Sequence, residues 1–235
     1  MKIIKIALGI IVLLAIIAVA VFNYFFRSAV PDYSGTVFLE GLASQVEVRT
    51  DQYGIPHIYA DNEPDLFFAQ GYIMARERLF QMDTTRLAGR GELSTLFGDI
   101  TLDKDRFLRT VGFYRKAQKS YEVLLPETKA ALKAFSAGVN RYIETADTLP
   151  REYFFLKSKP KPWEPADSIV VGLLMSYSLT RSKKIDLIMH RIGEKAGYVI
   201  MKAIIPSFPD IAPTLTGKRP GFSTSDTQPL SAHFT

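Results

Sequence analysis

The stretch DQYGIPHIYADNEPDLFFAQGYIMARERLFQMDTTRLAGRGELSTLFG, residues 51–98, decides the fold. It opens with a tight turn, Gln52-Tyr53-Gly54, and a short segment typical of a strand, His57–Tyr59. The period of the apolar residues then changes from two to about 3.6. The residues that set this helical period are Phe68, Tyr72, Ala75, Leu79 and Met82. The stretch therefore predicts a turn, a strand and a helix that lies on a core.

The sequence also predicts the two ends of this helix. Asn62 is a good helix cap, Pro64 is tolerated in a first turn, and Asp65 adds negative charge where the helix dipole favours it. Gly89 and Gly91 are expected to end the helix, and residues 92–97 are expected to form a short helical turn.

Strands are expected before this helix and further helices after it. The expected strands are Thr36–Leu39, Val46–Arg49 and His57–Tyr59. The expected helices are Lys104–Tyr121, one opened by Pro126, one opened by Pro165, and Ile185–Lys202. Because the segment Ile169–Tyr177 is apolar nearly all round, it is expected to be deeply buried. The pattern indicates an α+β fold that is mostly helical, with a few N-terminal strands.

The N-terminus predicts a membrane anchor. Residues 6–26 carry no charge, and a helix of that length would span the roughly 30 Å hydrocarbon core of a bilayer. Lys2 and Lys5 favour a cytoplasmic N-terminus, which would place the rest of the chain on the periplasmic or extracellular side. A cleaved signal peptide is the alternative. The expected divisions are a transmembrane signal-anchor (1–27), a main domain (28–205) and a linker-like tail (206–235).

Composition limits the class of protein. The chain has 235 residues, of which 47% are hydrophobic and 23% charged, which is typical of a globular protein. The net charge is +5, but the basic residues are scattered, so no nucleic-acid partner is expected. The absence of cysteine excludes disulfides, thiolate metal sites and a cysteine nucleophile.

No motif in this chain predicts its own catalytic machinery. The sequence lacks a phosphate loop, a Rossmann glycine pattern, HExxH, zinc-ligand spacing and a Gly-x-Ser-x-Gly elbow. Its three histidines are His57, His190 and His233. His57 follows Pro56 in an expected strand, so a hydrogen-bonded structural histidine is favoured over a catalytic base. On motifs alone the chain is therefore an anchored, mostly helical domain of unknown activity.

Four blocks in order resemble the penicillin acylase family, whose members carry aspartate, one or two residues, then Tyr-Gly-(Val/Ile)-Pro-His-Ile. The first block here is Asp51–Ile58. The later blocks are Arg109–Gly112, Phe135–Ile143 and Lys161–Ser168, the last of which is similar to the family's Trp-x-Pro-x-Asp-Ser pattern. The resemblance covers about residues 45–195.

This resemblance implies an amino-terminal-nucleophile hydrolase with an αββα sandwich. In that family a precursor cuts itself, and the serine freed at the start of a second (β) chain attacks an amide while its own α-amino group acts as base. The family's substrates are small acyl-amides, including penicillins, cephalosporins and acyl-homoserine lactones. The chain then resembles an α-subunit portion that needs a β chain and is inactive alone. The alternative is a membrane-tethered, non-catalytic remnant or binding module from a truncated gene.

The resemblance also suggests two roles for residues after the Trp-x-Pro block. Counting from Trp163 without gaps places Ser176 and Thr180 where relatives line the acyl pocket, although ordinary helix packing is equally open. The same count places Asp186 where relatives bind a structural calcium ion, shared with the β chain. An exposed helix carboxylate is the alternative for Asp186, because Lys183 and Lys184 are unfavourable neighbours.

Overall fold

A computed structural model describes residues 2–27, 33–180 and 182–204. The chain divides into two compact units, residues 1–179 and 180–235, and each is described by itself. The predicted tail, 206–235, lies outside the described residues.

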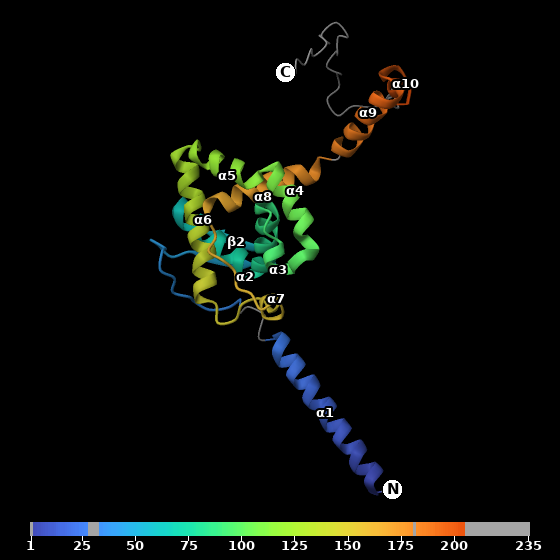
Figure 1. Ribbon diagram of the computed structural model, residues 1–235. Coiled ribbons are helices and arrows are strands. Elements are labelled where there is room, and N and C mark those ends of the chain that lie inside the picture. Colours follow the sequence, from blue (N-terminus) through green and yellow to red (C-terminus); the bar gives the residue numbers. More distant parts are fainter. Residues whose placement is uncertain (1, 28–32, 181, 205–235) are drawn as a thin grey trace. The chain divides into compact units, whose positions relative to one another are not determined.

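The described chain is mostly helical, with one two-stranded sheet (Figure 1). In the first unit the elements are α1 (Lys2–Arg27), β1 (Glu47–Thr50), β2 (Pro56–Tyr59), α2 (Glu63–Arg90), α3 (Ser94–Phe97), a 3-10 helix (Gly98–Thr101), α4 (Leu102–Val111), α5 (Phe113–Glu122), α6 (Pro126–Thr145), α7 (Arg151–Phe155) and α8 (Pro165–Leu179). The second unit contains α9 (Ser182–Ala196) and α10 (Tyr198–Ile204).

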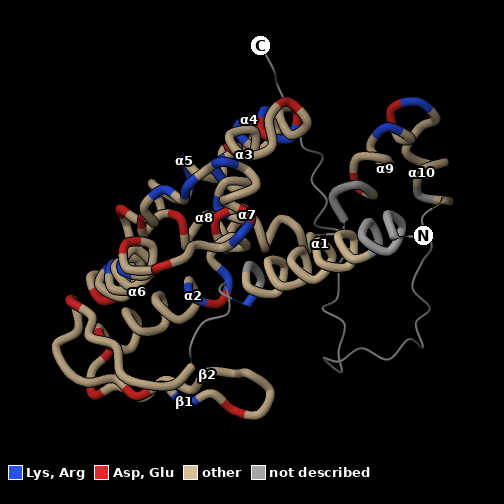
Figure 2. Tube along the Cα trace, turned by 90° about the horizontal axis from the view of Figure 1, so that it is seen from below, with Lys and Arg blue, Asp and Glu red and all other residues tan. Residues whose placement is uncertain are grey.

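The hairpin of β1 and β2 confirms the strand–turn prediction (Figure 2). The strands are antiparallel, with Val48 opposite Ile58. The Asp51 carboxylate holds the turn by accepting hydrogen bonds from the backbone N–H groups of Tyr53 and Ile55, each at 2.9 Å. The Ile55 N–H, first among these contacts, lowers the pKa of Asp51.

The first of the three expected strands, Thr36–Leu39, is absent from the described structure, so that prediction is wrong. Val37 and Phe38 are 66% and 95% exposed. A strand needs a neighbour for its backbone hydrogen bonds, and this segment pairs with neither β1 nor β2.

Helix α2 is the axis of the first unit and begins as predicted. The Asn62 side chain caps it by accepting from the Asp65 N–H at 2.9 Å, and Gly91 ends it in the left-handed conformation with φ of 67°. The dihedrals of Arg78 (φ −143°, ψ 25°) interrupt the helix at its middle.

The most extensive contact in the unit is the crossing of α2 with α6 (Figure 1). Gly71 and Gly138 allow the two backbones to meet there: a Cβ on Gly138 would lie 1.9 Å from the Phe68 carbonyl oxygen. One on Gly71 would lie 2.1 Å from the Phe135 carbonyl oxygen. Ala75, Leu79, Val139 and Tyr142 form the adjoining core, so the predicted apolar stripe of α2 is confirmed.

Two helices that the sequence predicts as continuous are each broken at a glycine. The segment 104–121 divides into α4 and α5 at Gly112, whose φ is 78°. The segment 185–202 divides into α9 and α10 at Gly197, whose φ is 89°. A positive φ is available to glycine at little steric cost, so both helix breaks occur there.

The predicted transmembrane helix is wrong. Residues 6–26 are helical within α1, yet among the described residues no helix combines the length and apolar character needed to cross a membrane. The predicted membrane anchor, membrane partner and periplasmic or extracellular orientation are therefore not supported.

A buried aspartate in the first turn of α2 holds the segment that precedes the hairpin. Asp65 is 2% exposed and accepts from the Ala43 and Ser44 N–H groups at 2.9 Å each, and from the Asn62 amide at 2.7 Å. The Ala43 N–H, followed by the Asn62 amide, holds the pKa of Asp65 below its usual range. One carboxylate thus joins the connecting segment to the helix.

We expect Gly138→Ala to destabilise the chain by about 3 kcal/mol, because the new methyl group must force α2 and α6 apart. Gly172→Ala in α8 is the matched control, since a Cβ there meets nothing within 4 Å. Urea unfolding of the full chain followed by circular dichroism measures both. Equal stability of the two variants would contradict a close crossing at Gly138.

We expect acid to remove the stability contributed by Asp65. Its lowered pKa means that this contribution is complete above the unfolded-state value, about 3.9, and is lost as the pH falls through the lower folded value. Asp65→Asn should therefore be less stable at pH 7 and show a smaller fall in melting temperature on acidification. Thermal melts between about pH 6 and 2.5 test this, with the exposed Asp61→Asn as control. Parallel pH profiles for wild type and Asp65→Asn would contradict it.

Candidate functional site

A buried ion network joins α2 to the start of α8. The Arg86 guanidinium, 3% exposed, donates from Nε to Asp83 Oδ1 at 2.7 Å and from Nη1 to Asp167 Oδ2 at 3.2 Å. It also donates to the carbonyl oxygens of Lys161 (2.6 Å) and Pro162 (2.8 Å). Buried charges are tolerated only when paired and hydrogen-bonded, and these contacts satisfy that condition.

The same network extends to α5 through Arg90. Its Nε donates to Asp167 Oδ1 at 2.6 Å, and its guanidinium lies 4.2 Å from the centre of the Tyr114 ring. Burial alone would lower the pKa of Arg90, but the hydrogen bond and charge of Asp167 outweigh it and raise the pKa. Burial, then the hydrogen bond to Glu164, raises the pKa of Tyr114. Tyr114 therefore stays a neutral donor.

Asn140 and Ser168 fix the position of Trp163. The Asn140 side chain pairs with both backbone groups of Trp163, accepting from its N–H at 2.6 Å and donating to its carbonyl at 3.0 Å. The indole N–H donates to Ser168 Oγ at 3.1 Å, and the Arg86 guanidinium lies 5.2 Å from the ring centre. The indole is therefore a rigid wall between α2, α6 and α8.

Trp163 borders a hollow of about 550 Å³ between α2, α6 and α8, called here the tryptophan hollow. The apolar residues of its wall include Met74, Met82, Leu132, Phe135, Trp163 and Met175. The polar residues are Gln70, Arg78, Gln81, Thr85 and Ser168. A mostly apolar hollow with few polar groups is typical of a site that receives an apolar side chain or ligand.

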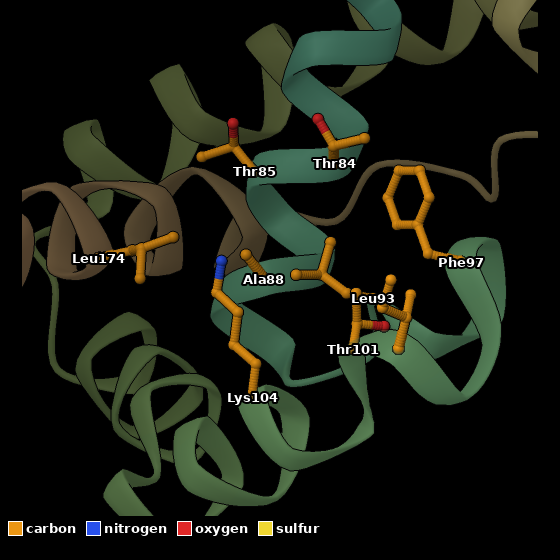
Figure 3. A pocket seen from close by; sticks show the side chains of 9 residues that line it. Thr84, Thr85, Ala88, Leu93, Phe97, Thr101, Lys104 and Leu174 are labelled. Carbon is orange, nitrogen blue, oxygen red and sulfur yellow. The ribbon is translucent and has the colours of Figure 1, made fainter.

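A second hollow, of about 570 Å³, lies between α2, α3, α4 and α8 and is called here the threonine hollow (Figure 3). Leu93, Ala88 and Leu174 form its apolar floor, and Lys104 reaches across it. The hydroxyl of Thr84 donates to the Phe80 carbonyl at 2.9 Å. Thr85 lines both hollows, so the two share one edge on α2.

Helix α8, from Val171 onward, forms a ridge between these hollows. Leu174 lines the threonine hollow, and Val171 and Met175 line the tryptophan hollow. Met175 and Leu179 are 61% and 73% exposed, whereas Val170 is fully buried. The prediction that Ile169–Tyr177 is deeply buried is therefore wrong for the outward side of α8, because no element in the described part of the first unit covers it.

Comparison with known proteins decides the family. The penicillin amidase profile matches residues 45–215. That segment is more than half of the chain. The chain belongs to the penicillin amidase family. The resemblance found in the four sequence blocks is thus confirmed.

Individual relatives agree with this assignment. The chain is 39% identical over 153 residues to penicillin acylase 2 proenzyme of Pseudomonas sp. (strain SE83), covering 63% of this chain and 20% of the relative. It is 31% identical over 185 residues to acyl-homoserine lactone acylase QuiP of Pseudomonas fluorescens (strain Pf0-1), covering 78% and 23%. It is 30% identical over 154 residues to penicillin G acylase of Escherichia coli, covering 63% and 18%.

A solved structure shares the fold of this penicillin amidase family chain. The thermostable penicillin G acylase from Alcaligenes faecalis matches with a TM-score of 0.60 and 25% sequence identity. The match covers 72% of this chain and 95% of the solved chain. The chain therefore spans about a fifth of the curated relatives but nearly the whole of one solved acylase chain.

The structure places the two predicted pocket residues at the end of α8. Ser176 is exposed on α8, and its hydroxyl donates to the Gly172 carbonyl at 3.0 Å. Thr180 follows α8, is exposed and belongs to the second unit. Ser176 lines neither of the two hollows. The pocket role of both residues stays a prediction.

Asp186, the predicted calcium ligand, is exposed on α9. Among residues 2–27, 33–180 and 182–204, no group of three or more His, Asp or Glu side chains could hold a metal ion. The described residues therefore do not by themselves fit a calcium site. Calcium ligation by Asp186 stays a prediction that requires ligands from elsewhere.

The histidines of the described chain make no catalytic arrangement. His57 Nε2 lies 3.4 Å from Asp51 Oδ2 at the exposed hairpin turn, which agrees with a structural role. His190 Nε2 lies 3.4 Å from Glu194 Oε1 on α9, and both side chains are exposed.

Sequence reasoning missed the ion network. Arg86 and Arg90 stand four residues apart on α2, but surface arginines show the same spacing. Asp167 carried a clearer signal, because an aspartate two residues after Pro165 can cap its own helix, and its Oδ2 does accept from the Glu164 N–H at 2.9 Å. Neither signal says that the charges meet across 81 residues.

We expect Asp167→Asn to destabilise the chain by about 3–5 kcal/mol, because Arg86 and Arg90 would lose the buried carboxylate charge that they share. Asp103→Asn is the matched control, since its pair with Arg106 has side chains 97% and 71% exposed and should change stability little. Chemical unfolding of both variants measures the difference. A decrease in the free energy of unfolding below about 1 kcal/mol for Asp167→Asn would contradict a stabilising role for the network.

Proposed function

We propose that this chain is the α-subunit portion of an amidohydrolase that cleaves acyl-amide bonds, and that a second chain supplies the nucleophile. The observation that carries the proposal is the pair of coverages: about a fifth of a relative named as a proenzyme, and 95% of one chain of a solved penicillin G acylase. In that penicillin G acylase, a segment of about this length is a separate chain.

The geometry supports this division of labour. Helix α8 presents an apolar ridge between two hollows, a surface suited to the wall of a pocket. In the proposed enzyme this chain provides rigid walls, and the second chain's N-terminal serine attacks the acyl carbonyl with its own α-amino group as base. That amine has a pKa near 8, so it can accept the proton at neutral pH without a histidine.

The substrate class follows from the names of the relatives. They are penicillin acylases and acyl-homoserine lactone acylases, and both names describe an acyl group joined through an amide. We propose acyl-amides of the penicillin, cephalosporin or acyl-homoserine lactone type as substrates. We further propose that Ser176 and Thr180 line the acyl pocket, where their hydroxyl groups would make the wall smaller and more polar than an aromatic one.

A chimeric precursor tests the function. The full chain is joined to the part of the Pseudomonas sp. SE83 proenzyme that follows its matched segment, and amine release is measured on phenylacetyl and straight-chain acyl chromogenic amides. We expect turnover by the chimera and none by residues 1–235 alone. Replacing the second chain's first serine with alanine should abolish turnover, and Ser176→Ala should change the acyl preference.

The parent proenzyme is the positive control. A chimera that folds and matures like its parent but hydrolyses nothing would contradict the proposed activity. That result would favour a non-catalytic remnant or binding module.

A further inference from the structure

Each hollow beside α8 carries one cation without a carboxylate partner. Arg78 lines the tryptophan hollow and Lys104 the threonine hollow, and neither makes a hydrogen bond or an ion pair with any residue of the described chain. Both side chains are exposed. The two cations thus stand on opposite sides of the α8 ridge.

The neighbouring carboxylates are already engaged. Glu77, beside Arg78, accepts from Arg76 Nε and from the Tyr33 hydroxyl, each at 3.0 Å. On α4, Asp105 is 2% exposed and accepts from the Leu93 and Ser94 N–H groups at 2.9 and 2.7 Å.

Asp103, next to Lys104 in the sequence, lies 3.4 Å from Arg106. Arg78 and Lys104 are therefore available to an acidic partner.

The surface between these cations is apolar and adaptable. Met74 and Met175, both in the wall of the tryptophan hollow, are 43% and 61% exposed. Methionine is flexible and fits irregular partners. A contiguous apolar surface rimmed by polar groups marks an interaction site. Helix α2 also departs from helical dihedrals at Arg78, which lies within this surface.

We infer that one acidic-flanked apolar segment of the second chain covers α8, placing an apolar side chain in the tryptophan hollow and carboxylates against Arg78 and Lys104. This inference rests on the proposed function, because the occupant is taken from the four-fifths of the relatives' length that this chain does not match. The chain's net charge of +5 also favours an acidic partner.

Two measurements on the chimeric precursor test this docking surface. The first is hydrogen peroxide footprinting: Met74 and Met175 should oxidise several-fold more slowly in the chimera than in residues 1–235 alone. The second is carbodiimide cross-linking, which joins an amine directly to a carboxylate in contact. Lys104, and Lys at position 78 in the Arg78→Lys variant, should each link to an aspartate or glutamate of the second chain.

Charge reversal supplies the matched comparison. Arg78→Glu and Lys104→Glu should restore fast oxidation of Met175, whereas Lys119→Glu, on the exposed side of α5, should leave the footprint unchanged. Unprotected methionines and no cross-link from positions 78 and 104 in a folded chimera would overturn the inference.

The outcomes separate this inference from the proposed function. Turnover without protection would retain the function and reject the docking surface. Protection and cross-links without turnover would retain the docking surface and reject the activity.

Discussion

The buried carboxylate of Asp167 is the constraint on which the arrangement of α2, α5 and α8 depends. With no exposure to water, it shares its charge with Arg86 and Arg90. The Arg86 guanidinium also donates to the Lys161 and Pro162 carbonyls and lies over the Trp163 ring, while the Arg90 guanidinium lies over the Tyr114 ring. Because each charge would be costly if left alone, the elements that carry them have one arrangement that satisfies all of them.

Buried aspartates join helices to neighbouring segments elsewhere in the chain as well. Asp65, Asp105 and Asp167 each lie in the first turn of a helix, each is at most 2% exposed, and each accepts from backbone N–H groups of the segment that precedes the helix or packs against it. The helix dipole favours a negative charge at this end. These aspartates therefore fix connecting segments that have few apolar contacts of their own, and so position the walls of both hollows.

One side of α8 contributes to the stability of this chain, and the other side serves its proposed function. Val170, on the inner side of α8, lies against Gly89 of α2, while Met175 and Leu179, on its outer side, are exposed. An apolar segment that is half-exposed is costly for a chain alone and is expected where a second chain completes the fold. The exposed ridge and the family assignment both support the proposal of a second chain.

The sequence by itself determined the local elements and the family. The cap at Asn62, the stop at Gly91, the start of α6 at Pro126 and the apolar stripe of α2 follow from periods and end signals that act within one or two turns. The exposed side of α8, the breaks at Gly112 and Gly197 and the missing strand at 36–39 did not follow from it, and the expected membrane span was wrong. Only the tertiary structure decided that Arg86 meets Asp167 and that Gly71 and Gly138 bring two backbones together, because contacts between residues far apart in the chain produce no short-range pattern in the sequence.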